Sequence, residues 1–144
     1  MSFPVLASPA EIGQVLKLNP LPETVEELEE MVREGLPKES LRASVQSLID
    51  DLSARRELMN ELVPEATFKR RTRLNLDESE KVARLARVLA SAIHVWSSEH
   101  DAQVFLNTPH PELGGRTPLD VARTELGARR VEALLWALFF GIPA

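Results

Sequence analysis

The sequence contains no cysteine. The chain can therefore form no disulfide bond, no thiolate zinc site and no cysteine nucleophile, and a reducing compartment suits it. Its longest apolar run, residues 133–142, is far shorter than the roughly 20 residues that cross a bilayer. The first residues lack the basic start and long apolar run of an export signal. We therefore expect a soluble, cytoplasmic protein without a membrane partner.

Sequence motifs for catalysis and metal binding are absent as well. The three histidines, His94, His100 and His110, are not spaced to place two of them with a carboxylate on one helix face, and there is no HExxH. The chain has no GxSxG, no GxGxxG and no Walker-type phosphate loop. We predict a non-enzymatic protein with no metal site and no cofactor. Its 144 residues are expected to form one compact unit.

No segment alternates between apolar and polar residues for long enough to form a strand, so the predicted fold is all-α. Thr24 with Glu27, and Asp77 with Glu80, are spaced as capping boxes that begin helices. The helix predicted over 77–96 has apolar residues in register and is expected to be a spine that joins both halves. The predicted helices cover 24–35, 38–52, 54–62, 65–73, 77–96, 99–106, 118–126 and 128–140.

Proline marks the least regular part of the chain. The first 22 residues hold four of the ten prolines and predict an arm or a loosely packed lead-in, with one helical turn near 11–18. We divide the chain into this arm (1–22), a helix-turn-helix region (23–75) and a C-terminal helical half (76–144).

Apolar spacing identifies the expected core of two of these helices. The helix over 38–52 should be buried along one stripe, and the short helix over 99–106 should pack its apolar end. The predicted core residues are Leu41, Val45, Leu48, Ile49 and Leu52 in the first, and Val104, Phe105 and Leu106 in the second.

Charge is unevenly distributed along the chain. The formal net charge of −5 would by itself argue against a nucleic-acid binder, yet residues 54–73 hold six basic residues against three acids. Two short helices separated by Val63 and Pro64 indicate a helix-turn-helix. The second would present Thr67, Lys69, Arg70, Arg71 and Arg73 to DNA phosphates and base edges. The alternative is that these cations pair with the acids of this same chain.

The most unusual segment is 107–120, NTPHPELGGRTPLD. Gly114 and Gly115 allow a sharp reversal that buries Leu113. Thr117 is a good N-cap and Pro118 suits the first helical position, while Asp120 stands where a capping box needs its acid. Arg116 is left at the mouth of the turn, and we expect it to contact a partner or to pair with Asp120 or Glu125.

The last helix carries more apolar surface than one face can bury. We expect a pause at Gly127, then a helix over 128–140 that buries Val131, Leu134, Leu135 and Leu138. Four further apolar residues lie outside this buried face: Trp136, Phe139, Phe140 and Ile142. Because exposing several such side chains would forfeit several kcal/mol at about 25 cal/mol per Å², we expect a partner surface. Folding back onto the spine helix and burial in a homodimer are the alternatives.

The C-terminal part of the sequence resembles the toxin-binding domain of the Xre/MbcA/ParS antitoxins. The matching residues are Leu113 to Asp120, followed by Thr124, Glu125, Gly127, Val131, Leu134, Leu135 and Gly141. The resemblance implies a C-terminal domain, from about residue 76, that covers the active site of a cognate toxin. Such toxins most often have the RES fold and consume NAD. The resemblance also implies an Xre-like helix-turn-helix, with VPEATFKRR in this sequence, and repression of the protein's own promoter as a dimer.

By position, the resemblance assigns toxin contact to the loop and to the end of the chain. The candidate toxin-binding residues are Leu113, Gly114, Gly115, Arg116, Thr117 and Asp120 of the loop and Ala144 of the tail, together with the surplus apolar residues Trp136, Phe139, Phe140 and Ile142. A rival interpretation is a dimeric helix-turn-helix regulator without a toxin, and a third is an adaptor that has lost DNA binding.

Overall fold

The computed structural model describes residues 5–142, which fold into helices and contain no strand beyond a single isolated bridge between Pro37 and Arg73. The predicted all-α fold is confirmed. The elements are α1 (Pro9–Val15), α2 (Val25–Glu34), α3 (Lys38–Leu48), α4 (Leu52–Leu62), α5 (Glu65–Arg70), α6 (Leu76–Trp96), α7 (Glu99–Leu106), the 3-10 turn η1 (Pro111–Leu113), α8 (Pro118–Val121) and α9 (Glu125–Phe140). Within 5–142, no helix is long and apolar enough to cross a membrane.

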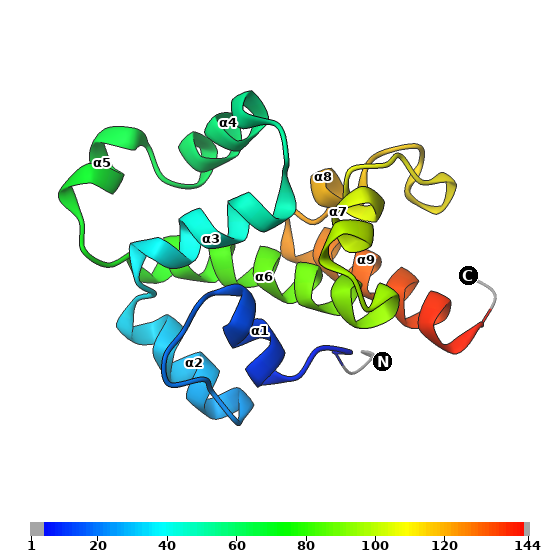
Figure 1. Cartoon of the computed structure of the whole chain (residues 1–144), viewed down its shortest axis with the longest axis horizontal. Coiled ribbons are helices and arrows are strands. Elements are labelled where there is room, and N and C mark those ends of the chain that lie inside the picture. Colours follow the sequence, from blue (N-terminus) through cyan, green and yellow to red (C-terminus); the bar gives the residue numbers. More distant parts are fainter. Residues whose placement is uncertain (1–4, 143–144) are drawn as a thin grey trace.

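The 21-residue helix α6 is the spine of the fold, as the sequence predicted. Figure 1 shows it running through the middle of the molecule, with α1 and α2 on one side, α3 on another and the C-terminal helices around its far end. Val82, Leu85 and Leu89 are almost wholly buried along it. Its N-terminus differs from the prediction: the capping box consists of Asn75 and Glu78 rather than Asp77 and Glu80.

The described part of the predicted arm, residues 5–22, is not loosely packed, because α1, which lies close to the helical turn expected at 11–18, is part of the core. Ser8 and Glu11 form a complete capping box, and Pro9 occupies the first helical turn, where proline is tolerated. Ile12 and Leu16 are buried, and the Leu16 carbonyl accepts a hydrogen bond of 2.6 Å from the Ser40 hydroxyl. The prolines therefore begin and follow this helix instead of preventing it.

The boundaries of α2 are those expected, since Thr24 caps its start and Gly35 follows its end. The next helix is shorter than predicted. It ends at Leu48 because Ile49 turns to an extended conformation, and Asp51 then caps α4. Leu52 is consequently 71% exposed on α4, so its assignment to the core was wrong. Val104 on α7 is also exposed rather than packed, while Leu106 is buried.

Gly127 does not interrupt the last helix, which begins earlier than predicted. Thr124 caps α9 by accepting a hydrogen bond of 3.0 Å from the Gly127 amide. A β-carbon at Gly127 would lie 1.8 Å from the Val121 carbonyl oxygen. Glycine at this position therefore permits the close approach of α9 to α8.

Candidate functional site

The double-glycine loop is held by its own backbone. The His110 amide donates to the Arg116 carbonyl at 3.1 Å, and the Gly115 amide donates to the His110 carbonyl at 3.0 Å. Gly114 and Gly115 both have positive φ, +67° and +78°, which other residues adopt only with strain. Leu113 is buried beneath the turn while both glycines are exposed. The sharp reversal predicted from the sequence is confirmed.

Thr117 caps α8, and Pro118 occupies its first position, as predicted. The carboxylate of Asp120 does not complete a capping box. It accepts a hydrogen bond of 3.0 Å from Nε of Arg116 instead, and both side chains are a little over half exposed. The expected pairing of Arg116 with Asp120 is confirmed, and the guanidinium remains accessible to a partner.

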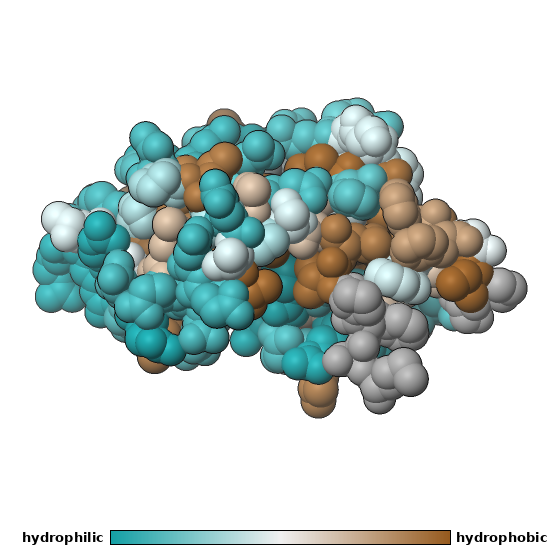
Figure 2. Space-filling view, turned by 90° about the horizontal axis from the view of Figure 1, so that it is seen from below, coloured by the Kyte–Doolittle hydropathy of each residue, from teal (hydrophilic) through white to brown (hydrophobic). Residues whose placement is uncertain are grey.

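The end of α9 carries a cluster of one half-buried and four exposed apolar residues, which we call the aromatic end: Trp136, Leu138, Phe139, Phe140 and Ile142. The last four are 43–52% exposed. The Phe140 ring lies 4.5 Å from Trp136 and 5.0 Å from Phe139, measured between ring centroids. Figure 2 shows apolar surface gathered toward this end of a largely hydrophilic molecule. The structure's own helices therefore do not enclose these rings.

The buried face of α9 is narrower than predicted. Val131, Leu134 and Leu135 are buried, but Leu138, which we had expected in the same face, is 45% exposed. One more turn of helix carries it past the end of the core, so it adds to the aromatic end. Ala144 lies outside the described residues.

An ion-pair network fastens α9 to α6. Arg87 on α6 donates to Glu132 at 2.8 Å and to Glu125 at 3.0 Å, and Arg84 donates to Glu125 at 3.2 Å. Burial acts to raise the pKa of Glu125, but the hydrogen bond and charge of Arg87, with hydrogen bonds from Arg129 and Arg84, hold that pKa below its ordinary value. The network fixes the direction in which the aromatic end projects.

The loop and the aromatic end lie at the same end of the molecule (Figure 1). Aromatic contacts connect the loop to the spine, since Phe105 lies 4.6 Å from Trp96 and 6.2 Å from His110 between ring centroids. His94 on α6 in turn packs 5.0 Å from Phe139. The two segments that the sequence singled out are thus supported by neighbouring parts of α6 and α7.

The basic segment is only partly a helix surface. Helix α5 ends at Arg70, so the prediction that Arg71 and Arg73 lie on it was wrong. The segment after it is extended because the Leu74 amide donates to the Leu36 carbonyl at 2.8 Å and Leu74 is buried. Arg71 pairs with Glu78, and Arg73 donates to the Gly35 carbonyl at 2.8 Å.

Three of the predicted DNA-contacting residues remain on α5. Lys69 is 73% exposed in its side chain and forms a 3.4 Å pair with Glu65. Arg70 is exposed, and Thr67 is half-buried beside it. The alternative of pairing with an acid of the same chain holds for Arg71 and for Lys69, whereas Arg73 binds a backbone carbonyl. Contact of this segment with DNA stays a prediction.

One connection between the halves was missed by sequence reasoning. Arg123, which precedes α9, pairs with Glu61 on α4. The two residues are 62 positions apart, and nothing in either local pattern indicates the contact.

Within residues 5–142, no group of three or more histidine, aspartate or glutamate side chains is arranged to hold a metal ion.

Each half of the chain matches a known family model. Residues 27–87 match the family model of the antitoxin Xre-like helix-turn-helix domain. Residues 91–141 match that of the antitoxin Xre/MbcA/ParS C-terminal toxin-binding domain. The two matches meet inside α6, and the first includes α4 and α5.

Two curated relatives carry the name Antitoxin Xre. The protein from Pseudomonas putida is 30% identical over 80 residues, which are 53% of this chain and 50% of that protein. The protein from Yersinia enterocolitica is 33% identical over 78 residues, which are 51% of this chain and 53% of that protein. The similarity thus spans about half the length of the curated relatives.

Proposed function

We propose that this chain, whose two halves match the Xre-like helix-turn-helix and Xre/MbcA/ParS toxin-binding family models, is the antitoxin of a toxin–antitoxin pair and neutralises a cognate toxin through its C-terminal half. The observation that carries this proposal is the aromatic end, an exposed apolar surface whose aromatic rings lie within the matched toxin-binding domain. A soluble protein that leaves this much clustered apolar surface uncovered is suited to bind another protein.

The exposed rings set the scale of the interaction. Phe140 is 52% exposed. Since a buried phenylalanine contributes about 200 Å² of surface, roughly 100 Å² remains available, equivalent to about 2.5 kcal/mol at about 25 cal/mol per Å². Phe140→Ala should therefore weaken toxin binding roughly sixtyfold in Kd. Leu76, 49% exposed at the other end of α6, provides a matched control, and Leu76→Ala should leave Kd unchanged.

The double-glycine loop forms the second part of the proposed toxin surface. Its exposed residues are Gly114, Gly115 and Arg116. The Arg116 guanidinium donates a hydrogen bond to the Asp120 carboxylate. Leu113 and Thr117 position the loop from within, the first by burial and the second by capping α8. Arg116→Ala should weaken toxin binding, while Arg116→Lys should restore only part of it, because lysine lacks the planar guanidinium fork.

We further propose that the toxin has the RES fold and consumes NAD, and that the antitoxin covers its active site. The test is to co-express this chain with the product of the adjacent reading frame and to measure co-purification, growth and cellular NAD. Co-purification with restored growth and NAD is the expected result. Failure of the two proteins to co-purify would contradict the antitoxin proposal, whereas a complex that restores growth with NAD unaffected throughout would contradict only the RES assignment.

The helix-turn-helix half is proposed to bind operator DNA and repress the protein's own promoter as a homodimer. Thr67, Lys69 and Arg70 on α5 are the proposed contacts. Binding to the upstream DNA should weaken steeply as salt rises, because phosphate contacts release counterions. Absence of that salt dependence would favour an adaptor without DNA binding. DNA binding without a co-purifying toxin would favour the rival dimeric regulator.

A further inference from the structure

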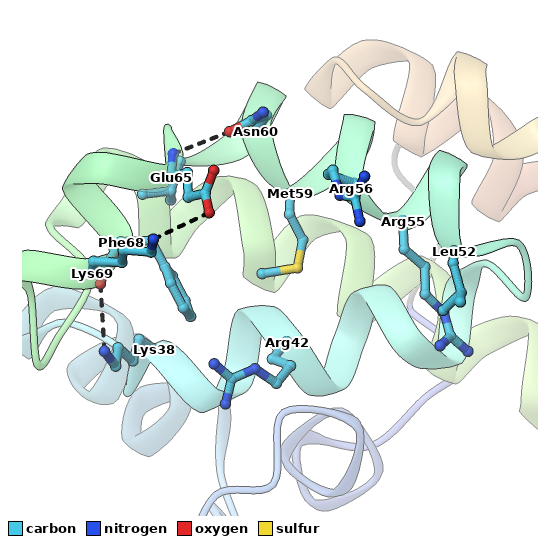
Figure 3. Close-up of a pocket in the computed structure, with 11 residues that line it drawn as sticks. Lys38, Arg42, Leu52, Arg55, Arg56, Met59, Asn60, Glu65, Phe68 and Lys69 are labelled. Atoms are coloured by element: carbon cyan, nitrogen blue, oxygen red, sulfur yellow. Dashed lines mark hydrogen bonds and ion pairs between the residues drawn. The ribbon is translucent and has the colours of Figure 1, made fainter.

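A bowl-shaped hollow of about 490 Å³ lies between α3 and the helix pair α4–α5 (Figure 3). Its volume falls within the roughly 300–1,000 Å³ of small-molecule sites. Its lining combines apolar and cationic side chains: Lys38, Arg42, Leu52, Arg55, Arg56, Met59, Asn60, Val63, Glu65, Phe68 and Lys69.

The inner wall of the bowl is apolar. The Phe68 ring and the Met59 thioether project toward α3 in Figure 3, and Val63 is almost wholly buried beside them. Lys38 Nζ lies 4.9 Å from the Phe68 ring centroid, and the Arg42 guanidinium carbon lies 5.4 Å from it. An aromatic or acyl group in the bowl would meet a flat ring and a polarisable sulfur atom.

The rim of the bowl is strongly basic. Its charged lining consists of one carboxylate, Glu65, and five cations: Lys38, Arg42, Arg55, Arg56 and Lys69. Glu65 pairs with Lys69, and Glu39, just outside the lining, pairs with Arg42. Arg55 donates to the carbonyls of Ile49 and Gln46, which are neutral acceptors. In a chain of net charge −5, this excess of positive charge favours an anion.

The bowl shares only Lys69 with the α5 surface proposed to contact operator DNA. Glu65, Phe68 and Lys69 are spaced three and four residues apart, so they share the helix face that lines the bowl. Thr67 and Arg70 do not line it. A small ligand in the bowl would therefore lie between α5 and α3 and would contact both helices. Lys38 on α3 already connects them through a 3.4 Å hydrogen bond to the Phe68 carbonyl.

We propose that this bowl is a binding site for a small organic anion with an apolar body, such as an aryl or short acyl group that carries a phosphate, sulfonate or carboxylate. The apolar part packs on Phe68 and Met59, and the anionic group binds Arg56 and Arg42 at the rim. This site goes beyond the proposed antitoxin function, and its binding can be measured without toxin or DNA.

The test follows amide chemical shifts of the full 15N-labelled chain during titration with 1-naphthyl phosphate. Saturable shifts should be confined to the bowl, including Lys38, Met59 and Phe68. Inorganic phosphate and 1-naphthol, which each lack one half of the recognised chemistry, should bind at least tenfold more weakly. Equal binding of inorganic phosphate, shifts confined to the aromatic end, or no saturable shift up to millimolar probe would each overturn the proposal.

A matched pair of variants distinguishes binding in the bowl from attraction of the probe to the overall charge of the protein. Arg56→Ala should weaken 1-naphthyl phosphate binding at least fivefold, while Arg33→Ala, on α2 and outside the bowl, should leave it unchanged. Both arginines are exposed, so both variants should keep the wild-type spectrum away from the substituted residue. Equal weakening by the two variants would show attraction to the overall charge and would refute a built site.

Discussion

Replacing Gly127 with alanine gives a prediction whose sign is decisive. In an ordinary helix, the change stabilises by about 1 kcal/mol, because alanine has the higher helix propensity. Here the added β-carbon would lie 1.8 Å from the Val121 carbonyl oxygen and 2.9 Å from the Thr124 hydroxyl oxygen, against an ordinary contact of at least 3.4 Å. The obstruction is backbone, so side-chain rotation cannot relieve it.

Relieving this overlap requires α9 to move away from α8 by more than 1 Å. That movement would break the N-cap at Thr124, whose loss costs about 1 kcal/mol, and would add an overpacking cost of about 1–3 kcal/mol. We therefore expect Gly127→Ala to lower the free energy of unfolding by about 3 kcal/mol. For a chain of this length, that corresponds to a decrease in Tm of about 10 °C.

Thermal unfolding followed by circular dichroism, with urea titration for the free energy, measures the effect. The neighbouring residue Leu126 is 79% exposed, so Leu126→Ala is the control and should change stability by less than about 0.5 kcal/mol. If Gly127→Ala melts at or above the wild-type Tm, the close packing of α9 on α8 is not what requires glycine at this position, and the reasoning fails.

Three further predictions concern charges. Glu132→Gln should destabilise the fold by about 2 kcal/mol in urea titrations, because Glu132 is mostly buried and Arg87 would lose its closest partner; an unchanged midpoint would contradict this. The pKa of Glu125 is lowered in the folded state, so its contribution to stability is present above its ordinary value of about 4.5 and is lost as pH falls through the folded pKa. The stability difference between wild type and Glu125→Gln should therefore shrink as urea titrations move from pH 7 to below pH 4.5, and a constant difference would refute the assignment. Arg70→Ala should reduce the salt slope of operator binding by about 1, whereas Arg71→Ala should leave that slope unchanged and lower Tm; the reverse pattern would exchange their roles.

Local patterns predicted the helices well wherever one residue type decides the geometry. Thr24, Thr117 and Gly35 mark helix boundaries through a cap or a turn, and the structure places the boundaries there. The spine helix was predicted because its apolar residues recur with helical spacing over its full length. In each case, the signal and the structure lie within a few residues of one another.

The errors arose where a distant contact overrode a local pattern. Helix α5 ends before Arg71 because Leu74 is drawn into the core and pairs with Leu36, which is far away in sequence. The prolines near the N-terminus suggested an arm, although Ile12 and Leu16 find partners on α6 and other helices. Such burial depends on the tertiary arrangement, which no window of sequence contains.

For the candidate site, the sequence identified the loop and the excess apolar surface but not their limits. Leu138 was assigned to the core because it continues the stripe of Leu134 and Leu135, and only the structure reveals that the core ends before it. The bowl between α3 and α5 was not predicted at all, since its lining comes from separate helices, with Arg42 on α3, Arg56 on α4 and Phe68 on α5.

The unbroken helix α6 has a consequence for any attempt to recombine these domains. At about 1.5 Å per residue it is roughly 31 Å long, and the boundary between the two family matches falls within it, between residues 87 and 91. A chimera joined there has no flexible hinge that could compensate for a wrong number of residues at the junction. Inserting a single residue would rotate one half against the other by about 100° and would turn the proposed toxin-binding surface to another side of the proposed DNA-binding surface.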